Sequence, residues 1–103
     1  MNIVIFVTTK DADEAKKISQ ELLTQKLIAC ANIVSGVQSI FWWEGKIDST
    51  SEVLLILKTK KSLFKKVEKV VKSLHSYQTP EIIALPIVTG SKEYLGWINE
   101  SLR

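Results

Sequence analysis

The sequence predicts an α+β domain in which helices cover one face of an antiparallel sheet. Two observations support this prediction. Runs rich in β-branched and aromatic residues have the length of strands, and the segments between them repeat their apolar residues with the period of a helix. The elements follow in the order β-α-β-β-α-β-α. Because the 103 residues contain no linker or repeat, we expect residues 1–103 to form a single domain.

The chain is expected to begin with a central strand and a helix. Residues 2–8 are almost continuously apolar, as in a strand that is buried on both faces. Asp11 has the position of an N-cap, and Glu14 completes the spacing of a capping box three residues later. The apolar stripe that follows predicts a helix over 12–26, with Lys26 in its last turn.

The next strands indicate that a second chain covers part of the sheet. We predict a strand over 27–34, a turn at Ser35-Gly36 and a hairpin whose second arm is 52–59. Side chains alternate along a strand, so the large apolar residues at 40–43 fall on both of its faces. A two-layer domain covers only one face of its sheet with its own helices. The uncovered face therefore predicts a homo-oligomer.

The second half of the chain completes the sheet. Ser62 is predicted to cap a helix whose apolar stripe runs over 63–74. A strand over 81–88 contains Pro86, which favours a position at the sheet edge or a bulge. A final short helix starts at 90–91. Two helices on one face of such a sheet give the ferredoxin-like β-α-β-β-α-β sandwich, here with an extra C-terminal helix.

Composition and charge argue against nucleic acid and membrane partners. The net charge is +3, but four lysines and a glutamate within 65–72 indicate a solvated helix face, and Arg103 is the only arginine. No apolar run is long enough to span a bilayer. Residues 2–7 lack a basic leader and are too short for a signal peptide, so we expect a cytoplasmic protein.

No catalytic constellation is visible, and we expect no enzymatic activity. The single histidine lacks the sequence context of a catalytic triad. The four glycines are scattered singly, and none opens a helix with the spacing of a phosphate-binding loop.

A metal site is chemically more natural. Cys30 is the only cysteine, and His75 closes the second predicted helix, ahead of Glu81. Thiolate, imidazole and carboxylate suit copper or zinc, so Cys30, His75 and Glu81 are candidate ligands. Nothing in their spacing forces them together. The alternative is a packed Cys30 and a His75 that only ends its helix.

A third possibility is a small-molecule or inter-chain cleft. Trp43, Lys58 and Tyr77 supply stacking surface and a positive charge at the margins of the predicted sheet. The alternative is that they are interface aromatics with a flanking lysine.

Five segments, in order along nearly the whole chain, resemble the CutA family of divalent-cation tolerance proteins. They are LIACANI at 27–33, SIFWWEGKI at 39–47, ILKT at 56–59, HSYQTPEII at 75–83 and YLGWI at 94–98. The resemblance implies a ferredoxin-like subunit in a compact homotrimer similar to PII signalling proteins, with the Trp-bearing hairpin packed against neighbouring subunits. It also implies a cytoplasmic, non-catalytic role in tolerance of copper and other divalent metals. The alternative is a PII-like signalling or scaffold module that binds a small ligand or a protein.

The resemblance also assigns positions. The cysteine of the family corresponds to Cys30, its histidine to His75 and its Pro-Glu pair to Pro80-Glu81. The inter-subunit cleft would be formed by Trp43, Glu44, Lys58 and Tyr77. The chain departs from the family at Val7 in the first strand and Leu74 before the histidine, where further soft ligands would stand, and at Ser76, where a proline usually follows the histidine. We therefore expect Cu or Zn to be bound only weakly, near a subunit interface.

Overall fold

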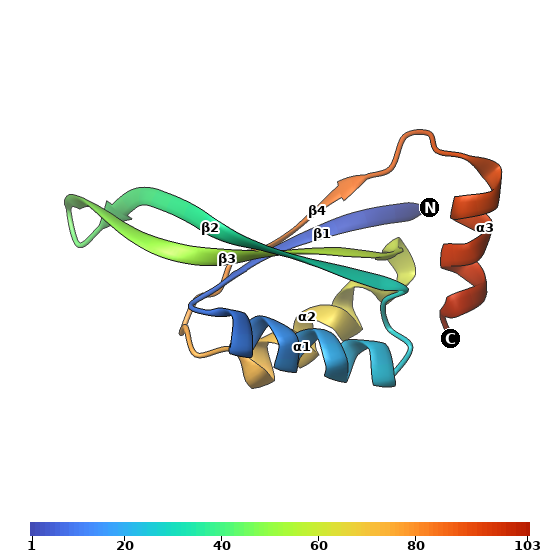
Figure 1. Ribbon diagram of the computed structural model, residues 1–103, viewed down its shortest axis with the longest axis horizontal. Coiled ribbons are helices and arrows are strands. Elements are labelled where there is room, and N and C mark those ends of the chain that lie inside the picture. The colour runs from blue at the N-terminus through green and yellow to red at the C-terminus, as the bar shows by residue number, and fades with distance from the viewer.

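Four antiparallel strands form one sheet in the order β2-β3-β1-β4 (Figure 1). The computed structural model describes residues 1–103. The strands are β1 (Asn2–Thr9), β2 (Cys30–Trp43), β3 (Lys46–Lys60) and β4 (Ile82–Pro86). The helices are α1 (Ala12–Thr24), α2 (Phe64–Leu74), which follows the short 3-10 helix η1 (Lys61–Leu63), and α3 (Lys92–Ser101). This order confirms the ferredoxin-like arrangement with an added C-terminal helix.

The core lies between one face of the sheet and the helices α1 and α2, which Figure 1 shows side by side below the sheet. Buried and half-buried residues alternate along β1, because successive side chains point to opposite faces. β1 is central, as predicted, since it pairs with both β3 and β4. The largest fully buried side chains of this layer are Ile5, Ile18, Leu22, Leu27, Ile28, Leu55 and Leu57.

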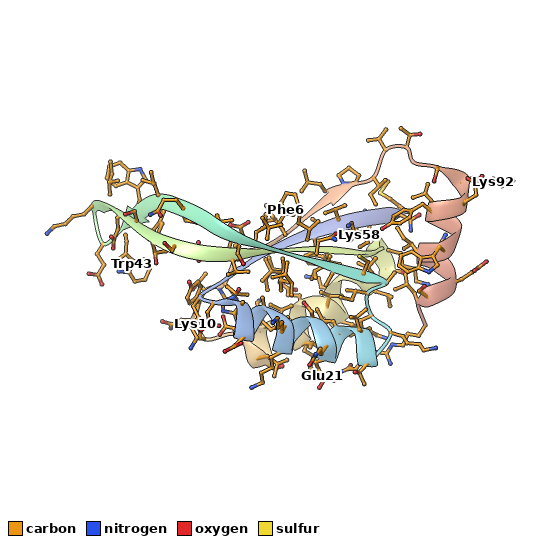
Figure 2. The ribbon with its side chains drawn as sticks, in the orientation of Figure 1. Phe6, Lys10, Glu21, Trp43, Lys58 and Lys92 are labelled. Carbon is orange, nitrogen blue, oxygen red and sulfur yellow. The ribbon has the colours of Figure 1, made fainter.

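The opposite face of the sheet, which we call the open face, is apolar but is not covered by α1 or α2. Figure 2 shows Phe6 and Lys58 on this side, away from these helices. Cross-strand pairs place apolar residues of all four strands together here. They are Val4, Phe6, Val34, Leu54, Ile56, Ile83 and Leu85, all half-buried or exposed.

β2 is a single strand of 14 residues, so the predicted turn at Ser35-Gly36 is wrong. The two residues form a bulge instead, where the register of β2 on β3 shifts between Val34 and Val37. Gly36 has φ +80°, a left-handed conformation that glycine adopts without a steric penalty. The strand also begins later than expected. Leu27 and Ile28 lie in the core before it, and the Thr59 hydroxyl donates to the Leu27 carbonyl at 2.6 Å.

The hairpin of β2 and β3 extends beyond the helices as a long arm, so the longest axis of the molecule is 44 Å (Figure 1). Its turn is Glu44-Gly45, flanked by the pair Trp43 and Lys46. Both turn residues have positive φ, 49° and 77°, as type I′ hairpins require. β3 runs from Lys46 through the polar stretch 48–51, so the second arm starts earlier than the predicted 52–59.

Local hydrogen bonds explain where the helices begin. Asp11 caps α1 as predicted, since its carboxylate accepts the Glu14 N–H at 2.8 Å. Ser91 caps α3 in the same way, accepting the Tyr94 N–H at 3.2 Å. The prediction for Ser62 is wrong. Ser62 lies inside η1, and α2 begins without a side-chain cap because η1 leads directly into it.

The end of α1 differs from the prediction by two residues. The helix ends at Thr24, and Lys26 follows it with φ 56°. The Lys26 N–H donates to the Leu23 carbonyl and the Leu27 N–H to the Leu22 carbonyl, both at 3.0 Å. This is the hydrogen-bond pattern of a Schellman motif, with lysine at the position that usually holds glycine.

The last strand is shorter than predicted but lies where proline indicated. β4 covers Ile82–Pro86 rather than 81–88, and it forms an edge of the sheet beside β1. Pro86 is its last residue, opposite Ile3. A proline is tolerated there because an edge strand has one side without ladder hydrogen bonds.

Candidate functional site

His75 is the C-cap of α2, and its side chain is 0% exposed. Its Nε2 lies 2.7 Å from the Thr8 carbonyl oxygen, and its Nδ1 lies 3.0 Å from the Tyr77 backbone nitrogen. A carbonyl only accepts and a backbone N–H only donates, so the neutral ring carries its proton on Nε2. Both nitrogens are therefore engaged within the chain. A metal would need the Nδ1 lone pair that now accepts the Tyr77 N–H.

Glu14 holds the loop that follows His75. One carboxylate oxygen accepts the Ser76 N–H at 3.1 Å, and the other accepts the Lys10 N–H at 3.5 Å and lies 3.7 Å from His75 Nδ1. The side chain is buried. The sequence indicated Glu14 as a local capping-box partner. In the structure it joins the start of α1 to the end of α2 instead.

Tyr77 connects the same loop to the base of the arm. Its hydroxyl donates to the buried Glu52 carboxylate at 2.8 Å. Glu52 comes just before Val53, which is in the last β1–β3 pair, and it faces Val37 next to the bulge of β2. Burial, followed by the hydrogen bond and the negative charge of Glu52, raises the pKa of Tyr77 to about 12. The Tyr77 ring also packs 4.7 Å from the His75 ring.

Cys30 lies in a different part of the molecule. It pairs with Lys58, which pairs in turn with Val4, at the end of the sheet near α3. The Thr8 carbonyl that holds His75 is four residues further along β1, about 13 Å away at ~3.3 Å per residue. Glu81 is exposed, just before β4. No group of three His, Cys, Asp or Glu side chains that could hold a metal ion forms in the chain. The candidate ligands Cys30, His75 and Glu81 are therefore not brought together.

The four predicted cleft residues are also spread over the molecule. Trp43 and Glu44 lie at the tip of the arm (Figure 2). Tyr77 contacts Glu52 at the base of the arm, about 20 Å from the tip along the strand at ~3.3 Å per residue. Lys58 lies on the open face. A cleft that contains all four residues requires parts of more than one chain.

Sequence reasoning missed the residues that organise both regions. Glu14 and Glu52 hold the loop 75–77. Asn32 lies beside both Cys30 and Lys58, and Tyr94 lies beside Cys30. Their contacts join residues far apart in the sequence, which no local pattern reveals. Only the position of Asn32 within the segment 27–33 could have drawn attention to it.

Comparison with known proteins identifies the family. The family model of the CutA1 divalent ion tolerance protein matches residues 3–101, nearly the full chain. The chain belongs to the CutA1 family. The divalent-cation tolerance protein CutA of Archaeoglobus fulgidus is 45% identical over 102 residues, which are 99% of this chain and 99% of that protein. Protein CutA 1, chloroplastic, of Oryza sativa subsp. japonica is 43% identical over 102 residues, 99% of this chain.

Coverage and structure agree with this CutA1 assignment. The chain spans 58% and 56% of the length of the plant relatives from Oryza sativa and Arabidopsis thaliana. The structure described as the periplasmic divalent cation tolerance protein CutA from Archaeoglobus fulgidus superimposes with a TM-score of 0.97 at 45% identity, with both chains fully covered. The structure of the divalent cation tolerance protein from Thermus thermophilus gives the same TM-score at 41% identity, again with full coverage. None of the three helices here has the length and hydropathy needed to cross a membrane.

Proposed function

We propose that the chain acts in divalent-cation tolerance as a homotrimer that binds divalent metal weakly near a subunit interface. The family assignment supports the role in tolerance. The observation that carries the assembly is the apolar surface left by the fold. Ile40, Trp42 and Ile47 on the arm are 71%, 73% and 67% exposed, and the open face adds a second apolar area.

A homotrimer would bury both apolar areas. Apolar patches that extend over several strands mark association surfaces in soluble proteins. An arm that projects from one subunit can reach the open face of a neighbour, whereas it cannot fold back on its own sheet. The number of three copies rests on the resemblance to CutA proteins and PII-like trimers.

The arrangement of the candidate ligands supports a weak site at such an interface. Cys30 and Glu81 are accessible, but a single chain gathers no set of three ligands. His75 contributes only if Tyr77 releases its Nδ1. Lys58 also stands opposite Cys30 and repels a cation there. Donors from two copies would therefore have to combine.

Titration calorimetry with Zn²⁺ tests the metal site, because zinc does not oxidise the thiol. Cys30→Ala and Glu81→Gln are each expected to weaken binding about tenfold, the effect of losing about 1.4 kcal/mol of binding free energy. Glu68→Gln is the control, since Glu68 pairs only with Lys65 and Lys72 on the surface of α2. Equal affinity in the wild type and the first two variants would remove these residues from the site.

A second candidate function is that of a PII-like signalling or scaffold module that binds a small ligand or a protein partner between subunits. The distribution of Trp43, Glu44, Lys58 and Tyr77 favours it. All four positions carry aromatic or charged groups; Trp43 and Glu44 are exposed, and Lys58 and Tyr77 are half-buried. Only a second copy brings the arm tip near Lys58 or Tyr77.

We further infer that the protein is not an enzyme and works in the cytoplasm. The names of the relatives describe cation tolerance and mention no reaction. A single, half-buried cysteine without a partner is suited to a reducing compartment, where it stays a thiol.

A further inference from the structure

A cluster of polar side chains interrupts the apolar open face where β2 and β3 meet α3. Lys58 donates to the amide oxygen of Asn32, and the Cys30 thiol lies 3.9 Å from the same oxygen. The Tyr94 hydroxyl of α3 lies beside Cys30. Figure 2 shows Lys58 on the side of the sheet away from α1 and α2. Three elements therefore contribute side chains to one place.

Lys58 has no carboxylate partner. The ion pairs between lysine and carboxylate in the chain involve only Glu68, with Lys65 and Lys72. Lys60 lies two residues further along β3 and so shares the face of Lys58, opposite Asn2. It is also absent from these ion pairs. The open face thus has two cations at this end and no anion that compensates them.

The free hydrogen-bonding groups of the cluster are donors. The oxygen of Asn32 is already used by Lys58 and faces Cys30, which leaves the Asn32 amide N–H groups free as donors. The Tyr94 hydroxyl is directed at the Cys30 thiol, so the donors open to a ligand are the Asn32 amide and the ammonium groups of Lys58 and Lys60. A place rich in donors and positive charge is suited to an oxyanion.

The surroundings increase the need for a counter-charge. Lys58 stands between apolar residues of the open face, with Ile56 two positions away and Val4 opposite. Covering this face with another subunit would remove water from the ammonium, which is costly unless an anion pairs with it. Tyr94 and Trp97 both belong to α3, and their ring centroids lie 5.5 Å apart, so the two rings form one aromatic surface.

We propose that the polar cluster where β2 and β3 meet α3 binds a small carboxylate- or phosphate-bearing anion. Lys58 is its main charge partner. This deepens the small-ligand function proposed above and rests on it, since it assigns the charge and the position of the ligand. The Asn32 amide N–H groups add hydrogen bonds, and Lys60 adds a second positive charge.

Calorimetry and thermal unfolding test the site with two probes, sodium phosphate and sodium citrate, against sodium chloride at matched ionic strength. At least one probe is expected to bind the wild type and to raise its unfolding midpoint beyond the effect of chloride, because a ligand of the native state stabilises it. Which probe binds shows whether phosphate or carboxylate is preferred. Lys58→Gln is expected to weaken that binding about tenfold, and Lys58→Arg to retain it.

Lys69→Gln is the matched control, because it removes the same charge from the exposed surface of α2. Binding that is equal in wild type and Lys58→Gln, or equally reduced in Lys69→Gln, would overturn the site. So would a wild type that binds neither probe.

Light scattering separates this result from the proposed assembly. A trimer that binds no anion would overturn the anion site and leave the assembly standing. A monomer that binds an anion through Lys58 would overturn the assembly and leave the anion site standing. If Lys58→Gln lowers the mass while no probe binds the wild type, Lys58 pairs with a neighbouring subunit, and the ligand site is wrong.

Discussion

Tyr77 joins two parts of the molecule through a single hydroxyl. Its hydrogen bond to Glu52 connects the loop after α2 with the base of the arm, while its backbone N–H fixes the ring of His75. Glu52 is buried, and Tyr77 is its hydrogen-bond donor. Removing the hydroxyl would leave this carboxylate without that donor. Such a loss costs about 1–3 kcal/mol in proteins.

The raised pKa of Tyr77 predicts a loss of stability at high pH. The pKa of Tyr77 is 10.0 in the unfolded chain and about 12 in the folded one. The contribution of the protonated hydroxyl to the free energy of unfolding is therefore complete below pH 10 and is lost as the pH rises through about 12. Urea unfolding of wild type and Tyr77→Phe at pH 7 and at pH 11 measures this effect. The variant should be less stable by about 1–3 kcal/mol at pH 7.

The difference between the two proteins should become smaller at pH 11, because phenylalanine does not ionise. A difference that is the same at both pH values would show that Tyr77 does not titrate with folding.

The Schellman motif at the end of α1 contains an unfavourable residue. Lys26 has a left-handed backbone at a position where most helices have glycine. A left-handed conformation costs an ordinary L-residue about 1–2 kcal/mol. The conformation persists because the bonds of Lys26 and Leu27 satisfy the last carbonyls of the helix and direct Leu27 into the core.

Lys26→Gly is therefore expected to stabilise the protein by about 1 kcal/mol, because glycine adopts this conformation without strain. Lys17→Gly, with the same chemical change in the exposed interior of α1, should destabilise it by about 1 kcal/mol. The free energy of unfolding in urea measures both variants. Equal signs for the two would contradict the argument.

An element could be predicted from the sequence where the residues that determine it lie close together along the chain. Asp11 caps α1 through a bond to a residue three positions later, so the sequence shows the cap, and the start of the last helix at 90–91 was predicted within a residue of its cap Ser91. The bulge at Ser35-Gly36 was mistaken for a turn, since a Ser-Gly pair suits both and only pairing with β3 decides. The partners of His75 come from β1 and α1, far away in the sequence. Its role in holding the loop could therefore not be predicted.

Assembly is the property on which the proposed metal site and the inter-subunit cleft both depend. We expect light scattering to give a mass of about three times the 11.6 kDa of one chain. Trp42→Lys, on the exposed arm, should reduce the fraction of trimer by placing an unpaired charge in the interface. Lys66→Trp is the control on the exposed surface of α2. A wild-type mass near one subunit would exclude the assembly.

The position of β1 has a consequence for how the protein is made. β1 precedes the other three strands of this sheet in the sequence, yet its neighbours are β3 and β4, and Ile3 pairs with Pro86. At a synthesis rate of about 5–20 residues per second, several seconds pass before both partners exist. The apolar run 3–7 has two unpaired edges until β3 is made and one until β4 is made, and unpaired edges are where strands aggregate. The strand that is paired on both edges in the finished sheet therefore waits longest for its partners, and α1 is the first element after it that can shield its apolar side chains.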